Sequence, residues 1–446
     1  MSEMNRRTFL NMATGAWVAS SLSPSMAATE APPIRIGLIG CGWYGGVLLD
    51  AAYKVGGVDV VALCDVDQRH LRETAEKLRQ RQGREPRTFR LYHEMLAAGG
   101  LDAVFIATPP HWHALQFLAA LDAGVHIYCE KPLAYDIREC QAMVRAARAH
   151  PDRVIQIGFQ RRQSLAIREV RERVQRGELG QVRQVDVQIH YTAGLLDSTP
   201  QDPPPELDWE LWCGPAPKLP YSPQIGHKSW RLEKEYGHGH LVDWGIHWID
   251  AVRWILNADV PRRVEASGTL VRYAGRITTP DTMTAVFDFD GIPVVWRHRL
   301  WGAQEYDPDT SNGVFLYGDE GTIFVTDHRW VFIPRGRPAE RKTTEAKADL
   351  ARLHMEDFLA AVRQRRAASG TVSDAYRSTA AVKLAMMSLD LGRPVKWDSK
   401  THEAVGDEAI RLMKRDYRAP YVHPWRGEPW AGDTAERRDE RAWRVS

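Results

Sequence analysis

The sequence has little cysteine, almost no net charge and no long apolar run. Its five cysteines, Cys41, Cys64, Cys129, Cys140 and Cys213, show no Cys-x-x-Cys spacing, so they do not form the thiolate pattern of a metal site. We interpret them as small buried residues. A net charge of +2 excludes the basic field of a nucleic-acid-binding protein. No segment beyond the N-terminal region has about 18 consecutive apolar residues, so no membrane span is predicted.

What remains is the composition of an ordinary globular protein. The chain has 446 residues, of which 44% are hydrophobic and 26% charged, as is typical of globular proteins. This length suggests two or three domains and permits a large core without disulfides. Sixteen tryptophans are many, and such a surplus suits both a core and a site that stacks on sugar rings.

The N-terminus predicts export. Paired Arg6 and Arg7 precede a weakly apolar stretch and a small-residue "SMAA", with cleavage expected after Ala27 or Ala28. This order resembles a twin-arginine signal, so we expect residues 1–28 to be a signal peptide of a periplasmic protein. The alternative is an amphipathic start that is never cleaved. The twin-arginine route carries folded proteins, so a cofactor could be loaded before export.

Apolar strands alternate with helices in the first part of the chain. The expected strands are residues 34–40, 58–65, 101–110, 125–132 and 153–159. Apolar strands separated by helices predict a parallel sheet with helices on both faces. We therefore expect an α/β fold whose first domain, residues 34–159, is a doubly wound parallel sheet.

The pattern changes near residue 160. A helix is expected over "DWGIHWIDAVRWIL", and strand candidates then follow at residues 264–273, 281–290, 293–301, 313–317 and 321–327. Sequential strands with short connections predict a largely antiparallel sheet. Two helices are expected after it, over residues 344–365 and 373–391. Residues 160–425 thus form a predicted second domain, and the charged residues 426–446 a loose tail.

A glycine motif predicts a dinucleotide site. Gly40-Cys-Gly42-Trp-Tyr-Gly45 lies between a strand and a helix, the context in which G-x-G-x-x-G binds a dinucleotide. The glycines permit a tight turn, close approach of the pyrophosphate and close helix packing. Asp65 ends the second strand, where a carboxylate accepts ribose hydroxyls and repels a 2′-phosphate. The motif favours NAD over NADP, although nearby Arg69 softens that preference.

Four further motifs make the chain recognisable. They are "ATPPHWH" (107–113), "YCEKPL" (128–133), "GFQRRQ" (158–163) and "DWGIHWID" (243–250). Together with the glycine motif they resemble the Gfo/Idh/MocA oxidoreductases, relatives of glucose–fructose oxidoreductase and inositol dehydrogenase. The order and spacing match over residues 34–425, and "RAPYVHPW" near the end is similar to the exported bacterial branch with twin-arginine signals.

The resemblance implies a fold, a set of site residues and an assembly. It implies a Rossmann domain followed by an α/β domain with a large, mostly antiparallel open sheet, whose face serves as the interface of a homodimer or homotetramer. Lys131, Asp243 and His247 carry over as the catalytic residues. The candidate cofactor-binding residues are Gly40, Gly42, Trp43, Tyr44, Gly45, Asp65, Thr108, Pro109, His113, Glu130 and Gln160. The candidate substrate-binding residues are Arg161, Tyr191, Trp230 and Arg231.

The "DWGIHWID" residues have distinct expected roles. Asp243, His247 and Asp250 would share one face of a helix. His247 has a suitable pKa for a general base, and we expect Asp243 to hydrogen-bond its imidazole and raise that pKa. Lys131 would donate to the substrate oxygen. Asp250 is expected to pair with Arg253 or to cap a neighbour.

A metal site is the alternative for the same segment. Asp243 and His247 could in principle gather round zinc with His238 and His240. The His-Gly-His spacing does not suit two ligands on one helix face, and the family chemistry needs no metal. No metal is therefore predicted, and we expect His238 and His240 in a loop near the substrate.

These features predict an exported NAD-dependent oxidoreductase that acts on a sugar, glycoside or polyol hydroxyl. Free NAD is scarce outside the cytoplasm, which favours a tightly bound cofactor that is recycled within one active site. One alternative is a redox-neutral glycosidase that works by oxidation, elimination and reduction. Another is a non-catalytic NAD(H)-binding protein, against which the presence of Lys131 and the Asp243/His247 pair argues.

Overall fold

The computed structural model describes residues 31–305 and 307–430. The predicted signal peptide and residues 431–446 of the predicted tail lie outside these ranges. Within them, no helix has both the length and the apolar character needed to cross a membrane.

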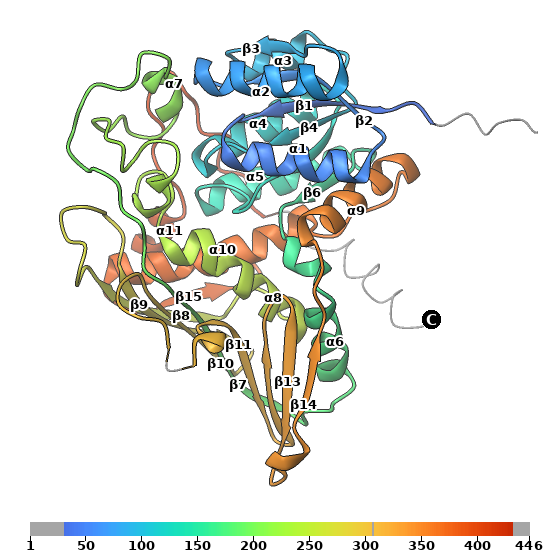
Figure 1. Ribbon diagram of the computed structural model, residues 1–446. Helices are drawn as coiled ribbons and strands as arrows, with labels where there is room; N and C mark the ends of the chain where they lie inside the picture. The colour runs from blue at the N-terminus through green and yellow to red at the C-terminus, as the bar shows by residue number, and fades with distance from the viewer. Residues whose placement is uncertain (1–30, 306, 431–446) are drawn as a thin grey trace, which may run out of the picture. The chain divides into compact units, whose positions relative to one another are not determined.

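The first sheet consists of six parallel strands in the order β3-β2-β1-β4-β5-β6 (Figure 1). Its strands are β1 (Ile34–Ile39), β2 (Val58–Cys64), β3 (Arg87–Phe89), β4 (Ala103–Ile106), β5 (His126–Cys129) and β6 (Ile155–Ile157). All four residues of β4 are fully buried, because helices cover both faces of the sheet. The prediction of a doubly wound parallel sheet is confirmed.

Two sets of helices cover this sheet. α1 (Trp43–Val55) and α2 (Gln68–Gln82) pack on one face, in one apolar cluster with Ile36, Leu38 and Val60. The helices α3 (Tyr92–Ala97), α4 (Pro110–Asp122) and α5 (Ile137–Ala149) pack on the other face. The helix starts follow local chemistry: Asp67 caps α2, and Asp136 forms a capping box with Glu139 at α5.

The second sheet has ten strands in the order β14-β13-β12-β11-β7-β10-β9-β8-β15-β16. β7 and β10 are parallel, and the other neighbours are antiparallel. The strands are β7 (Val182–His190), β8 (Arg263–Thr269), β9 (Thr282–Phe289), β10 (Ile292–Arg299), β11 (Asn312–Gly318), β12 (Gly321–Val325), β13 (Arg329–Pro334), β14 (Lys342–Glu345), β15 (Val395–Asp398) and β16 (Glu403–Ala404). The prediction of a mostly antiparallel second sheet is confirmed.

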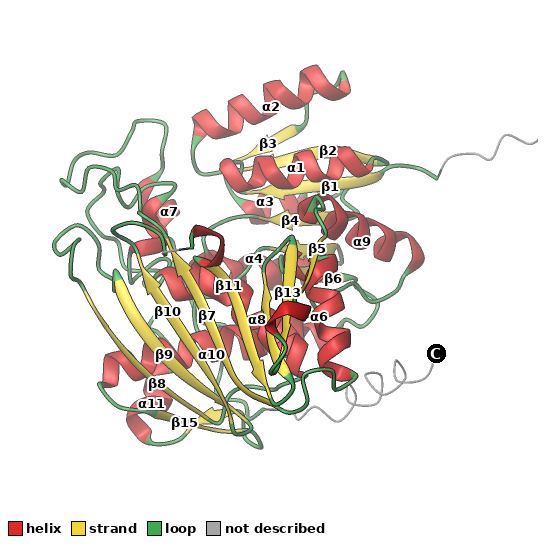
Figure 2. Ribbon diagram, turned by 60° about the horizontal axis from the view of Figure 1, so that its bottom comes forward, coloured by secondary structure: helices red, strands yellow, loops and turns green. Residues whose placement is uncertain are grey.

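One face of this sheet is covered by helices and the other is open. β9 buries Ala285 and Phe287 and exposes Thr284 and Val286, the period-two alternation of a half-covered sheet. Figure 2 shows the covering helices on one side of the strands. They are α6 (Leu165–Gln175), α8 (Ile246–Leu256) and α10 (Val372–Leu391). Assembly through the open face stays a prediction.

Short helical elements complete the described chain. The helices α7 (Trp209–Cys213) and α11 (Asp407–Leu412) and the 3-10 turns η1 (Gln160–Gln163), η2 (Ser229–Leu232), η4 (Pro308–Thr310) and η5 (Pro338–Glu340) lie in or beside connections. A π-helical turn, η3 (Leu241–Gly245), runs directly into α8.

The expected helix over residues 344–365 is wrong at its start. Lys342–Glu345 is instead the edge strand β14, because it pairs with β13. The helix α9 (Leu350–Gln364) begins after Asp349, whose side chain accepts the backbone N–H of Arg352. Strands β13, β15 and β16 were not predicted either.

After β14, the chain returns to the first sheet before it adds β15 and β16 to the second. α9 packs against α1, and Met355, Phe358 and Leu359 complete the apolar cluster that contains Leu48 of α1. Trp430 lies at the end of the described chain, with its ring centroid 4.4 Å from that of His402. All five cysteines are buried, as predicted.

Candidate active site

The turn after β1 has the backbone geometry that a dinucleotide requires. Gly40 adopts φ +96° and lies so close to Ala107 that a Cβ would come within 2.8 Å of its carbonyl carbon. A Cβ on Gly45 would lie 2.0 Å from the carbonyl oxygen of Gly40, so the helix can approach only without one. Gly42 begins α1 with no side-chain cap, and the nearest atom to a Cβ there is 3.9 Å away. The first N–H groups of α1 are therefore free to bind phosphate.

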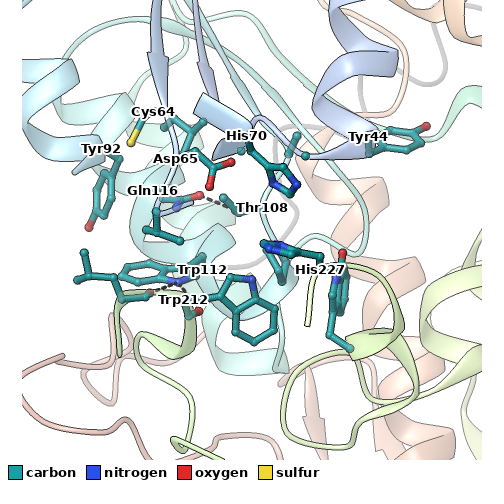
Figure 3. Close-up of a pocket in the computed structure, with 18 of the residues that line it drawn as sticks. Tyr44, Cys64, Asp65, His70, Tyr92, Thr108, Trp112, Gln116, Trp212 and His227 are labelled. Atoms are coloured by element: carbon teal, nitrogen blue, oxygen red, sulfur yellow. Dashed lines mark hydrogen bonds between the residues drawn. The ribbon is translucent and has the colours of Figure 1, made fainter. Parts of the chain in front are cut away.

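A cavity of about 300 Å³ opens at this turn (Figure 3). Of the predicted cofactor and substrate residues, those that line it are Gly40, Gly42, Trp43, Tyr44, Asp65, Thr108, Pro109, Trp230 and Arg231. These residues come from both domains, since Trp230 and Arg231 belong to the segment between β7 and α8. The residues present fit a dinucleotide: a free helix start for its phosphates and a carboxylate at the end of β2 for its ribose.

The Asp65 carboxylate is held rigidly in this cavity. One oxygen accepts the backbone N–H of Cys41 at 2.6 Å, and the other accepts that of Asp67 at 2.8 Å. Burial raises the pKa of Asp65, and these two N–H groups oppose the rise. Each oxygen keeps a further lone pair that can accept a ribose hydroxyl.

Several predicted cofactor residues lie behind the cavity wall. His113 is fully buried and does not line the cavity; its Nδ1 lies 2.9 Å from the Pro132 oxygen and its Nε2 2.8 Å from the Thr108 oxygen. The expectation that His113 lines the cofactor pocket is therefore wrong, because both ring nitrogens point at carbonyl groups of the protein. It supports the backbone of Thr108, which does line the cavity.

Glu130 and Gln160 form a buried network beside Tyr44. Gln160 Nε2 donates to the hydroxyl of Tyr44 at 3.0 Å and to Glu130 at 3.1 Å. Burial raises the pKa of Glu130 to about 7. Neither residue lines the cavity, but Gln160 connects Glu130 to Tyr44, which does.

Lys131 and Asp243 meet where the two domains face each other. The Lys131 Nζ lies 2.7 Å from Oδ1 of Asp243 and 2.8 Å from its backbone oxygen. Arg231 Nε lies 3.1 Å from the other carboxylate oxygen. Burial alone would raise the pKa of Asp243, but the two cations outweigh it and hold that pKa below its usual value. The carboxylate thus fixes two cations, of which Arg231 lines the cavity, whereas Lys131, Asp243 and His247 do not.

The expected hydrogen bond between Asp243 and His247 is absent. Residues 241–245 form a π-turn, which has more residues per turn than an α-helix, so the two side chains are not stacked one α-turn apart. The Asp243 carboxylate binds Lys131 and Arg231 instead. Nδ1 of His247 is buried and has no hydrogen-bond partner in the described chain.

The electrostatic expectation for His247 is wrong as well. Its pKa lies well below the ordinary value, because burial disfavours the charged ring and the nearby Lys131 and Arg161 repel a proton. We had expected a carboxylate partner to raise this pKa. The imidazole is therefore neutral at physiological pH.

Asp250 belongs to the core. Its carboxylate accepts two bonds from Arg162, at 2.8 and 2.9 Å, and one from the Ser378 hydroxyl at 2.7 Å. The expected partner, Arg253, instead donates to Ser378 and to backbone oxygens. The pairing with Arg253 was wrong because the sequence could not show that Arg162 faces this helix.

The remaining predicted substrate residues lie on the second domain's side. Arg161 binds Asp327 through two nitrogens, and its guanidinium lies 3.9 Å from the ring centroid of Trp248. Its Nη1 is buried without a hydrogen-bond partner among the described residues. The Tyr191 ring packs 5.0 Å from that of His240, and burial raises its pKa to about 12.

His238 and His240 are buried side chains. His238 lies 3.0 Å from Lys383 and stacks on Tyr135, whereas His240 packs near Trp296. In the part of the chain that the structure describes, these histidines do not gather with Asp243 and His247 into a metal-holding group.

Some residues that line the cavity are not among the predicted site residues. Tyr92, Trp112, Trp212 and Tyr421 all line the cavity. The rings of Tyr92 and Tyr421 meet that of Trp112 edge to face, with centroids 5.9 and 5.3 Å away. The only sequence signal for Tyr421 was the "RAPYVHPW" segment, to which no role had been assigned.

Comparison with known proteins gives two family matches. Residues 34–159 match the Gfo/Idh/MocA model described as "Oxidoreductase family, NAD-binding Rossmann fold". Residues 165–423 match the model described as "Oxidoreductase family, C-terminal alpha/beta domain". The two matches meet near the point where the sequence pattern changes.

Individual relatives extend this likeness. The inositol 2-dehydrogenase of Salmonella typhimurium is 31% identical over 171 residues, which are 38% of this chain and 49% of that protein. The chain thus matches about half the length of its first curated relatives. The myo-inositol 2-dehydrogenase of Thermotoga maritima is 26% identical over 303 residues, 66% of this chain and 76% of that protein. The crystal structure of aldose-aldose oxidoreductase from Caulobacter crescentus, complexed with glycerol, has a TM-score of 0.64 at 19% identity and covers 82% of this chain and 99% of that one.

Proposed function

Since the chain belongs to the Gfo/Idh/MocA family of oxidoreductases, we propose that it is an exported NAD-dependent enzyme that oxidises a hydroxyl of a sugar, glycoside or polyol. One observation carries this proposal. The Lys131 ammonium is fixed 2.7 Å from Asp243, and the same carboxylate binds Arg231, which lines the dinucleotide cavity. Lys131 itself does not line the cavity, but Asp243 links this cationic donor to Arg231, which does.

The charges around Lys131 suit an oxygen that gains negative charge. Two cations, Lys131 and Arg231, share the single carboxylate of Asp243, which leaves one positive charge in excess. An ammonium has three donors, and two of them can serve the oxygens of Asp243 while the third donates to a substrate hydroxyl. Fixed donors aimed at developing charge in a partly dry site stabilise an alkoxide strongly.

His247 is the proposed proton acceptor. Its imidazole is neutral because burial and neighbouring cations lower its pKa, and a neutral ring can take up the hydroxyl proton. Its Nδ1 is committed to no other group in the described chain. Bound nicotinamide would supply the acceptor for the hydride, and the residues above hold the substrate oxygen and its proton.

The proposed substrate class rests on the relatives, and the proposed site of action rests on the export signal. The relatives' names, inositol 2-dehydrogenase and aldose-aldose oxidoreductase, support a polyhydroxylated substrate. The twin-arginine pattern of residues 1–28 supports a periplasmic site of action, where a released NADH could not be reoxidised from a cytoplasmic pool. We therefore propose that the cofactor stays bound between turnovers.

The test starts from the mature protein. Bound nicotinamide is measured first, and glycosides and polyols are then screened while absorbance at 340 nm and released sugars are followed. NADH formed in proportion to substrate supports a dehydrogenase, and sugar release without net NADH supports the redox-neutral glycosidase. Absence of both bound nucleotide and turnover would reject the enzyme proposal.

A pair of variants links the activity to Lys131. Lys131→Met should lower kcat/KM by roughly a hundredfold or more, the usual size for removing a donor to a developing oxyanion. The matched control is Lys234→Met, because Lys234 forms an exposed ion pair with Asp390 and should keep its activity. Equal activity in both variants would remove Lys131 from the mechanism.

A further inference from the structure

A second cluster of polar groups lies at the wall of the dinucleotide cavity. It consists of Asp67, which begins α2, of His70 in the first turn of α2, and of His227 from the segment between β7 and α8. His70 and His227 line the cavity. Figure 3 shows the two imidazole rings next to each other, with ring centroids 4.4 Å apart.

The two oxygens of Asp67 have different environments. Oδ1 accepts the backbone N–H groups of Arg69 and His70 at 2.8 and 3.2 Å and so caps α2. Oδ2 faces the imidazoles: it lies 2.8 Å from Nε2 of His227 and 4.0 Å from Nδ1 of His70. Helix capping therefore accounts for one oxygen and leaves the other directed at two histidines.

The buried atoms of this cluster lack hydrogen-bond partners. The Asp67 side chain is only 1% exposed, yet neither its Oδ2 nor Nε2 of His227 has a hydrogen-bond partner among the described residues. The two atoms lie 2.8 Å apart, the distance of an ion pair if the ring is protonated, whereas with a neutral ring a lone pair on each atom is open to a shared cation. His227 also has φ +46°, a strained conformation for a non-glycine residue, and such strain often marks a functional position.

The other candidate metal cluster of the described chain is fully satisfied. Asp136, Glu139 and His423 also lie within reach of one another. Asp136 and Glu139 form the capping box of α5, and they further accept bonds from Arg415 and Tyr417. No ligand atom is left over there, so that cluster serves helix capping and the anchoring of the C-terminal segment.

The geometry points to a divalent transition-metal site formed by Oδ2 of Asp67, Nδ1 of His70 and Nε2 of His227. Two imidazoles and one carboxylate suit zinc. Ligand atoms about 2.1 Å from a tetrahedral zinc ion are about 3.4 Å apart, and the separations of 2.8 and 4.0 Å lie on either side of that value. The fourth position opens to the cavity, where water or a phosphate oxygen can fill it.

The site joins two parts of the chain that already touch. Asp67 and Leu207 form an isolated β-bridge, and the backbone N–H of Gln68 donates to Glu206 at 2.9 Å. A metal ion at His227 would add a strong link between the β2–α2 connection and the segment that covers the cavity. It lies on the ribose and phosphate side of the cavity, apart from Lys131 and Asp243.

The test measures metal directly. The full mature protein is stripped with a chelator and titrated with Zn²⁺ and with Co²⁺, whose visible absorption reports the coordination geometry. We expect one metal per chain for the unaltered protein. The variants Asp67→Asn and His227→Gln should lose it; Asp67→Asn keeps the helix cap, because asparagine caps as well as aspartate, so loss of binding there is not loss of folding.

The matched control is His93→Gln, since His93 lines the same cavity but belongs to no metal-holding group. It should bind metal like the unaltered protein. Failure of the unaltered, folded protein to bind either metal stoichiometrically at micromolar concentration would overturn the proposal, and so would equal binding by Asp67→Asn. Either result would leave the cluster as an Asp67–His227 ion pair. The readout needs no activity, so failure of the proposed function does not affect it.

Discussion

Asp250→Asn should separate structure from catalysis within the "DWGIHWID" segment. The change keeps the shape of the side chain and removes its charge. Asp250 is 1% exposed and accepts two bonds from Arg162, which is 7% exposed. Removing one partner of a buried ion pair typically lowers the free energy of unfolding by about 3–5 kcal/mol.

The structure places the expected loss at the lower end of that range. Arg162 keeps a second carboxylate, Asp374, at 2.7 Å, so its charge is not left alone. We expect about 3 kcal/mol, a change of more than a hundredfold in the unfolding equilibrium. The folded fraction should keep its bound nucleotide and its kcat, because Asp250 touches neither the cavity nor Lys131.

The decrease in the free energy of unfolding is measured by urea unfolding, followed by tryptophan fluorescence. The kcat is measured from turnover under native conditions. The control is Asp102→Asn, which breaks the exposed Arg35–Asp102 pair and should cost less than about 1 kcal/mol. The reasoning fails if Asp250→Asn is no less stable than this control, or if it loses kcat while its stability is unchanged.

Four other predictions follow from the cavity and the core. Gly42→Ala should fold, because the nearest atom is 3.9 Å from the new Cβ. It should weaken NAD binding, measured by calorimetry, about tenfold or more, because the new methyl group crowds the pyrophosphate. Gly45→Ala should fail to fold, because its Cβ would lie 2.0 Å from a backbone oxygen. Asp65→Asn should raise kcat/KM with NADP relative to NAD, since the charge that repels a 2′-phosphate is gone; an unchanged ratio in steady-state assays would contradict this. Burial lowers the pKa of His298 and of His354 to about 4, whereas the unfolded chain binds these protons near pH 6.5. The free energy of unfolding should therefore fall by about 3 kcal/mol for each ring as the pH drops from 6.5 to 4. A urea midpoint that does not change over that range would refute this prediction.

Local chemistry explains what could be predicted from the sequence. The glycine turn depends only on residues within one short motif. Gly40 and Gly45 stand where the turn leaves no room for a Cβ, so their positions in the sequence already indicate it. The parallel and antiparallel sheets follow from apolar runs and from period-two alternation. Edge strand β14 was missed because four polar residues carry no such signal, and its pairing with β13 decides its conformation.

Long-range partners could not be predicted. Nothing in the sequence indicates that Arg162 rather than Arg253 binds Asp250, or that Asp67 faces His227. The π-turn at residues 241–245 also hides a contact from the sequence. An α-helical register places the side chain of Asp243 beside His247, whereas the π-turn does not. Propensity and spacing describe a segment, whereas these contacts depend on which segments the fold brings together.

The packing of α9 on α1 limits how this protein can be divided. A fragment ending near residue 159 would contain every strand of the first sheet and the whole glycine turn. It would lack Met355, Phe358 and Leu359, and the surface of α1 that α9 covers would be left facing water. Such a fragment should aggregate, so the nucleotide-binding half is not a transferable module. An exchange of domains between relatives would have to carry α9 along, although α9 lies between β14 and α10 of the second domain in the chain.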